Sequence, residues 1–190
     1  MIKTGIKIPE GDYSNPDVIS NELKYIFSYP TKSRPYCTPK PIYFYGIKNT
    51  KYPPDIKEMI EQFKQIRESQ CSPLSQQVWH IIITFPFLFT DNAVQYFAFA
   101  DNIAWLFGQY YPVCYAYHTD NKVTGGKHSH FHYIISTASY VPGYPALDSD
   151  QLMQYFENVS CIANQYNISL YHHQSEEELA CLNLTTIFSR

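Results

Sequence analysis

Four of the seven histidines fall within fifteen residues, at positions 118, 128, 130 and 132. Side chains on a β-strand alternate between its two faces, so His128, His130 and His132 are expected on one face, with neighbours about 7 Å apart. Two neighbouring imidazoles at this spacing can converge on one ion, whereas three from a single strand spread too far. A third ligand must therefore come from another segment.

His118 can supply this third imidazole, because residues 111–118 read as the preceding strand. The loop at 119–127 contains two adjacent glycines and would turn the chain into an antiparallel hairpin. Such a hairpin places His118 opposite His130 and His132. These three side chains are the predicted metal ligands.

The donor set limits the choice of ion and its chemistry. Imidazole suits Mn, Zn, Ni, Co and Fe better than Mg, and the expected cofactor is a divalent ion: Mn, Mg, Zn or Ni. Asp120 could hold the second nitrogen of a ligand histidine, and His128 and His80 are additional candidates for the site. Three imidazoles leave coordination positions open, so the ion could act as a Lewis acid on a phosphoryl oxygen. His172 and His173 are expected to be ordinary surface residues.

Composition restricts the class of protein. With 190 residues, of which 45% are hydrophobic, the chain is expected to form one domain over residues 1–190, although the tail from about 175 shows little pattern. There is no apolar run of the ~20 residues that a membrane span needs, and no apolar signal segment at the N-terminus. Five cysteines without a C-x-x-C pair argue against a disulfide framework and a zinc ribbon. A cytoplasmic protein without membrane partners is expected.

Charge is distributed unevenly along the chain. Residues 1–70 hold 11 of the 14 basic and 8 of the 17 acidic residues, a net charge of +3, whereas residues 71–190 carry −6. Any affinity for phosphates should therefore depend on the N-terminal third.

Hydrophobic spacing predicts alternating strands and helices. An edge strand is expected at 2–8, and further strands at 42–45, 78–85, 111–118, 128–136 and 168–172. Helices are expected at 18–26, 55–66 and 94–108, the last capped by Thr90 or Asp91, and after a cap at Asp148 or Asp150. The four prolines between 30 and 41 indicate an irregular loop. The pattern indicates an α/β sandwich with helices on one or both faces of a sheet.

The histidine motif resembles motif III of the plasmid mobilisation relaxases. These proteins are HUH endonucleases, named for two histidines that flank a hydrophobic residue, here His130-Phe131-His132. The segment Leu23 to Ser33, which contains Tyr25-Ile26 and Pro30-Thr31-Lys32-Ser33, resembles the family's catalytic-tyrosine segment. Val78 to Phe85 resembles its His-Ile-Ile-x-Ser-Phe strand. The similarity covers roughly residues 2–173 in the family's motif order.

The resemblance implies a central, mainly antiparallel sheet of about five strands with helices on its faces. The large helicase or primase domain that is usual in this family is expected to be absent. It also implies a metal-dependent relaxase that nicks and rejoins single-stranded DNA at a transfer origin during plasmid mobilisation, with accessory relaxosome proteins as further partners. Tyr25 would attack the phosphate and form a 5′-phosphotyrosine, and Asp120 would orient a ligand or accept a proton. Tyr29 and Tyr36 are substitutes for the nucleophile. The candidate phosphate contacts are Lys24, Lys32 and Arg34.

Three other interpretations remain open. His128-x-His130-x-His132 also resembles the histidine-triad nucleotide hydrolases, although Ser129 is polar where that motif is apolar, and that family explains neither Tyr25 nor His118. Another HUH class, such as a rolling-circle replication initiator, usually places its tyrosine downstream of the histidine pair. The third alternative is a metal- or DNA-binding remnant without activity.

Overall fold

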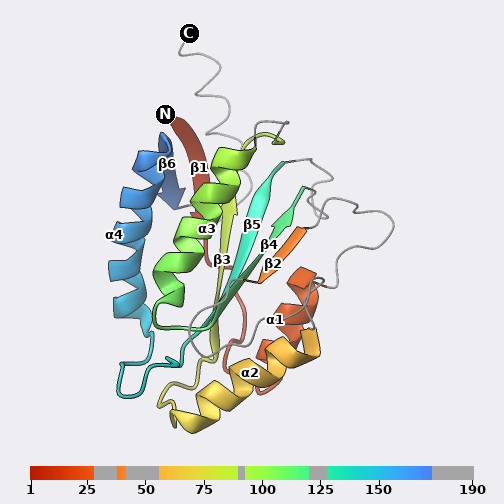
Figure 1. Ribbon diagram of the computed structural model, residues 1–190, viewed down its shortest axis with the longest axis vertical. Coiled ribbons are helices and arrows are strands. Elements are labelled where there is room, and N and C mark those ends of the chain that lie inside the picture. The colour runs from red at the N-terminus through yellow and green to blue at the C-terminus, as the bar shows by residue number, and fades with distance from the viewer. Residues whose placement is uncertain (28–37, 42–55, 90–92, 120–127, 173–190) are drawn as a thin grey trace.

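A single sheet of six strands organises the part of the chain that the structure describes (Figure 1). The structure is a computed structural model and describes residues 1–27, 38–41, 56–89, 93–119 and 128–172. The elements follow in the order β1 (Ile2–Lys7), α1 (Val18–Phe27), β2 (Thr38–Pro41), α2 (Ile56–Ser69), β3 (Val78–Thr84), α3 (Val94–Gly108), β4 (Val113–His118), β5 (His130–Ser136), α4 (Ser149–Gln165) and β6 (Ile168–His172).

The strand order across the sheet is β2-β4-β5-β3-β1-β6. All neighbouring pairs are antiparallel except β1 and β6, which run parallel. The predicted fold class is therefore confirmed, with six strands where about five were expected. The prediction that residues 2–8 form an edge strand was wrong, because β6 pairs with the outer side of β1 after α4 returns the chain.

The proline-rich segment was also only partly predicted. Residues 30–41 were expected to be an irregular loop, but Thr38–Pro41 forms β2 and pairs with β4. Proline lacks a backbone N–H and is tolerated in a sheet mainly on edge strands. The position of β2 at one edge of the sheet is consistent with its two prolines. The strand predicted at 42–45 lies outside the described residues.

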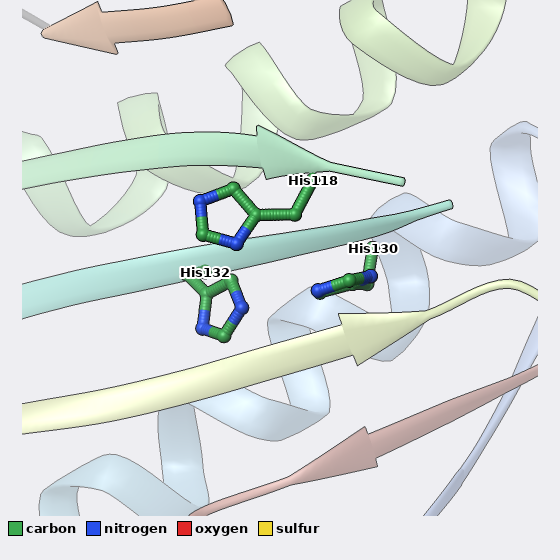
Figure 2. Close-up of side chains that lie close together, drawn as sticks. All are labelled: His118, His130 and His132. Carbon is green, nitrogen blue, oxygen red and sulfur yellow. The ribbon is translucent and has the colours of Figure 1, made fainter. Parts of the chain in front are cut away.

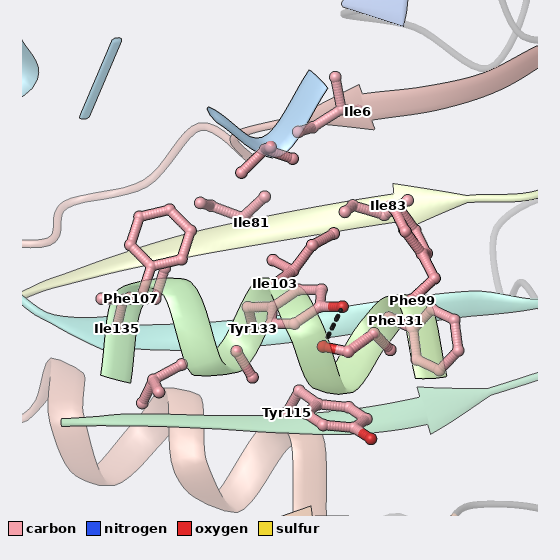
Figure 3. Close-up of a cluster of buried hydrophobic side chains, with 14 of the residues drawn as sticks. Ile6, Ile81, Ile83, Phe99, Ile103, Phe107, Tyr115, Phe131, Tyr133 and Ile135 are labelled. Carbon is pink, nitrogen blue, oxygen red and sulfur yellow. Dashed lines mark hydrogen bonds between the residues drawn. The ribbon is translucent and has the colours of Figure 1, made fainter. Parts of the chain in front are cut away.

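One face of the sheet packs against α3 and α4 and carries the larger core. Ile81 and Ile83 of β3 and Phe131, Tyr133 and Ile135 of β5 point to this face and are almost completely buried. Figure 3 shows them against α3, where the hydroxyl of Tyr133 donates to the carbonyl of Ala100 at 3.3 Å. Phe131 and Tyr133 thus lie opposite the histidines of the same strand, as the alternation predicts.

The other face packs against α1 and α2 over part of its length. Here Val78, Cys114, Ala116 and Ile134 form a second core with apolar residues of the two helices. Further along the same face, each of the strands β3, β4 and β5 carries a histidine next to these apolar side chains: His80, His118 and His132. The end of α1 therefore lies where this core meets a group of imidazoles.

Helix ends agree in part with the predicted caps. The side chain of Asp148 accepts a hydrogen bond from the backbone N–H of Gln151 at 2.9 Å, which is the geometry of an N-cap. The residue that precedes α3 is Ala93, without a side-chain cap, and the predicted caps Thr90 and Asp91 lie outside the described residues. In the part of the chain that the structure describes, every helix is too short or too polar to span a bilayer.

Candidate metal centre

Three imidazoles meet on the face of the sheet beside α1. His118, at the end of β4, is paired directly with His130 of β5, and His132 follows two residues later on the same face. One nitrogen from each ring can be chosen so that all three lie within 4.8 Å of one another. Figure 2 shows these nitrogens pointing into the space between the rings. The hairpin predicted from the sequence thus brings together the three side chains named as ligands.

The cluster is buried: the three histidines are 3 to 7% exposed. Burial holds the pKa of His132 well below its ordinary value of 6.5, and repulsion from His118, His130, His80 and Lys7 acts in the same direction. His132 is therefore neutral at neutral pH and keeps a lone pair for an ion.

The outer nitrogen of His118 is held by the backbone of α1. His118 Nε2 lies 3.0 Å from the carbonyl oxygen of Ile26. A carbonyl can only accept, so the proton must sit on Nε2. The lone pair of His118 is then on Nδ1, the nitrogen that faces the other two rings.

The buried His80 and the partly buried Glu22 lie behind His132. His132 Nδ1 lies 2.8 Å from Nε2 of His80, on the neighbouring strand β3. The other nitrogen of His80, Nδ1, lies 2.7 Å from Oε2 of Glu22, on α1. Both nitrogens of His80 are thus occupied by protein groups. His80 stands behind the ligand set rather than within it.

His130 and His128 differ in their placement. His130 Nδ1 lies 3.3 Å from the carbonyl oxygen of His128, which directs Nε2 toward the cluster. The expectation that β5 begins at His128 was wrong, because the strand begins at His130. His128 is half-buried, with its ring centroid 5.1 Å from that of His130, and is not one of the three clustered histidines.

These residues fit a divalent ion. Each of the three rings has one nitrogen taken by a protein partner and the other directed inward, the arrangement that metal-binding histidines usually show. Bonds of about 2.1 Å to a metal would require the nitrogens to approach one another by roughly an ångström. A neutral set of three imidazoles suits Zn, Mn or Ni and leaves positions free for a ligand.

Tyr25 lies against the cluster. Its ring meets that of His132 edge-on, with the centroids 5.7 Å apart, and lies 6.2 Å from that of His80. The side chain is nevertheless 49% exposed. The structure thus places an accessible phenol next to buried imidazoles, although the two segments are about a hundred residues apart in the sequence.

The other predicted residues divide into two groups. Lys24 is exposed on α1 next to Tyr25. Several candidates lie outside the described residues: Tyr29, Lys32, Arg34, Tyr36 and Asp120.

Two residues near the cluster were not predicted from the sequence. Glu22 lies three residues before Tyr25, a spacing that puts both on one helix face, and this was the available signal. Lys7 of β1 is paired with Ile82, which is paired with His132, so Lys7 and His132 belong to one row across the sheet. For Lys7 no sequence signal existed, because the row is created by strand pairing.

A comparison with known protein families matches the part of the chain that contains the histidine cluster. Residues 42–168 match the family described as "Relaxase: MobA/VirD2-like, nuclease domain". The match covers well over half of the chain and includes His80, His118, His130 and His132, whereas Tyr25 and Glu22 precede it. No curated protein and no solved structure matches the chain significantly.

Proposed function

This chain belongs to the MobA/VirD2-like relaxase nuclease family, and on that premise we propose that it nicks and rejoins single-stranded DNA through Tyr25. The relaxase family implies a DNA substrate and a strand-nicking activity. The finer proposal is a transesterification at a transfer origin during plasmid mobilisation, with a 5′-phosphotyrosine as the intermediate. The contact between the half-exposed Tyr25 ring and His132 is the observation that carries it.

The nucleophile of this reaction must also be able to act as the leaving group, because the reverse reaction rejoins the strand. The phenolic oxygen of Tyr25 bonds to phosphorus while the bond to the 3′ oxygen breaks. The phenolic proton passes to a base, and the departing oxygen gains a proton. Because the phosphodiester is replaced by a phosphotyrosine ester, the reverse reaction can reseal the strand without another energy source.

The imidazole cluster supports this step. A bound divalent ion would polarise a nonbridging phosphate oxygen. His118, His130 and His132 would hold that ion within reach of Tyr25, and their burial limits competition from water. A phenol has a pKa near 10, so a proton acceptor is also required. Asp120 remains the proposed residue for orienting a ligand or accepting this proton.

Basic residues beside the cluster would bind the DNA backbone. Lys7 lies two strands from His132, about 10 Å across the sheet, and its long side chain can reach a phosphate near the cluster. Lys24 is exposed on α1 next to the proposed nucleophile. Lys32 and Arg34 are further proposed phosphate contacts. Accessory relaxosome proteins are the proposed protein partners.

The test is covalent trapping of a labelled single-stranded oligonucleotide that carries the origin. Tyr25→Phe should abolish both nicking and the protein–DNA adduct, because only the phenolic oxygen is removed. Metal affinity should be unchanged, since the ring still packs on His132. Tyr171→Phe, at an exposed tyrosine of β6, is the matched control and should retain the adduct. An adduct that persists in Tyr25→Phe, mapped by mass spectrometry to Tyr29, Tyr36 or another side chain, would refute the assignment.

A further inference from the structure

We propose that Glu22 and His80 are positioning residues that orient His132 toward the ion, so that α1 controls both the nucleophile and the ligands. This inference rests on the metal site of the proposed function and deepens it. Its basis is the line of contacts from Glu22 Oε2 to His80 Nδ1, 2.7 Å, and from His80 Nε2 to His132 Nδ1, 2.8 Å.

The first contact decides where His80 carries its proton. At 2.7 Å the carboxylate oxygen and the ring nitrogen are in ion-pair range, and two lone pairs that face each other at that distance would repel. A carboxylate has only lone pairs to offer, so the proton belongs to His80 Nδ1. A neutral His80 then has a lone pair on Nε2.

The second contact, between His80 Nε2 and His132 Nδ1, fixes which nitrogen of His132 carries its proton. Because His80 Nε2 can only accept, His132 Nδ1 must donate, and the lone pair of His132 is left on Nε2. That nitrogen points toward His118 and His130 (Figure 2). The opposite arrangement, with His80 donating to His132, would leave a proton on the nitrogen that faces the ion.

Helix α1 thereby orients two of the proposed metal ligands, His132 and His118. Glu22 orients His132 through His80, and the carbonyl of Ile26 orients His118 directly. Tyr25 lies between these two residues in sequence, and positions 22, 25 and 26 share one helix face. A rigid element that carries the nucleophile and also fixes two imidazoles holds the reacting groups at a constant separation.

The experiment measures divalent metal affinity by chelator competition on the full chain, using Zn²⁺ and Mn²⁺ separately. Glu22→Ala and His80→Phe should each lower the affinity about 10- to 100-fold, the usual effect of losing a partner behind a metal-binding histidine. The double variant should bind little worse than either single one, because both break the same line of contacts. Glu61→Gln, which removes a charge from the exposed surface of α2, should match the wild type.

A conservative replacement of His80 distinguishes the orienting role of its nitrogens from the contribution of its ring to packing. In His80→Gln the amide oxygen can accept from His132 Nδ1 and the amide nitrogen can donate to Glu22, so this variant should regain most of the affinity lost in His80→Phe. Because a buried substitution can prevent folding, ring-nitrogen NMR of the metal-free wild type gives an independent readout. It should show His132 protonated on Nδ1 and His118 on Nε2.

Two results would overturn the proposal: His132 protonated on Nε2 in the wild type, or folded Glu22→Ala and His80→Phe proteins with wild-type affinity. Either could occur in a protein that still binds metal and forms the Tyr25 adduct, so it would leave the proposed function intact. A wild type that binds neither ion would instead refute the metal site and, with it, this proposal.

Discussion

Acid should destabilise the metal-free protein through His132. The pKa of this buried imidazole is held well below 6.5, by burial first and then by repulsion from the neighbouring histidines and Lys7. In the unfolded chain His132 takes up a proton as the pH falls below 6.5, whereas the folded protein resists this uptake. The unfolded state then binds more protons, and the stability present above pH 6.5 is lost as the pH falls.

The size of the loss follows from the same linkage. Because the folded protein binds this proton less readily, the free energy of unfolding should fall between pH 7 and pH 5 through this residue alone, by up to about 2 kcal/mol, the limit set by protonation of the unfolded ring. This is a large fraction of the stability of a typical domain, which is about 5 to 15 kcal/mol.

Urea unfolding at both pH values, with a chelator present, measures the effect. Other groups also titrate in this range, so the relevant quantity is the difference between wild type and His132→Gln, which lacks the titrating ring. The wild type should lose up to about 2 kcal/mol more than this variant, and His128→Gln, outside the three clustered histidines, should behave like the wild type. Parallel pH dependences of the wild type and His132→Gln would show that His132 is protonated as easily in the folded state, and the reasoning from burial would be wrong.

Two further predictions concern the N-terminus of α4 and the surface beside the cluster. Asp148→Ala should lower the free energy of unfolding by about 1 kcal/mol, because the N–H of Gln151 loses its acceptor; Asp150→Ala should cost less in the same thermal or urea unfolding experiment, and equal losses would argue against a specific cap. Lys7→Ala should weaken binding of single-stranded DNA and reduce the slope of log affinity against log salt by about 0.7, the value for one phosphate contact. Lys64→Ala, on α2, should leave that slope unchanged in fluorescence titrations, and an unchanged slope in Lys7→Ala would exclude the proposed phosphate contact.

The local pattern of residues was sufficient for most of the architecture. Alternation along β5 correctly put Phe131 and Tyr133 in the core and His130 and His132 on the other face, because strand geometry fixes the direction of successive side chains. Asp148 was recognisable as a helix cap for a similarly local reason. The position of β1 inside the sheet was not predictable in this way, since it depends on β6, a strand from the far end of the chain that pairs with the outer side of β1.

For the candidate centre, the sequence was enough to predict which histidines gather, because the spacing of His130 and His132, with His118 across a hairpin, is a property of neighbouring segments. The contacts around these histidines depend on how distant segments pack together. Packing of α1 on the sheet put Tyr25 beside His132 and Glu22 behind His80, and strand pairing put Lys7 in the same row. These contacts join segments far apart in the chain, and their geometry is set by the burial of both cores rather than by any local preference of the residues involved.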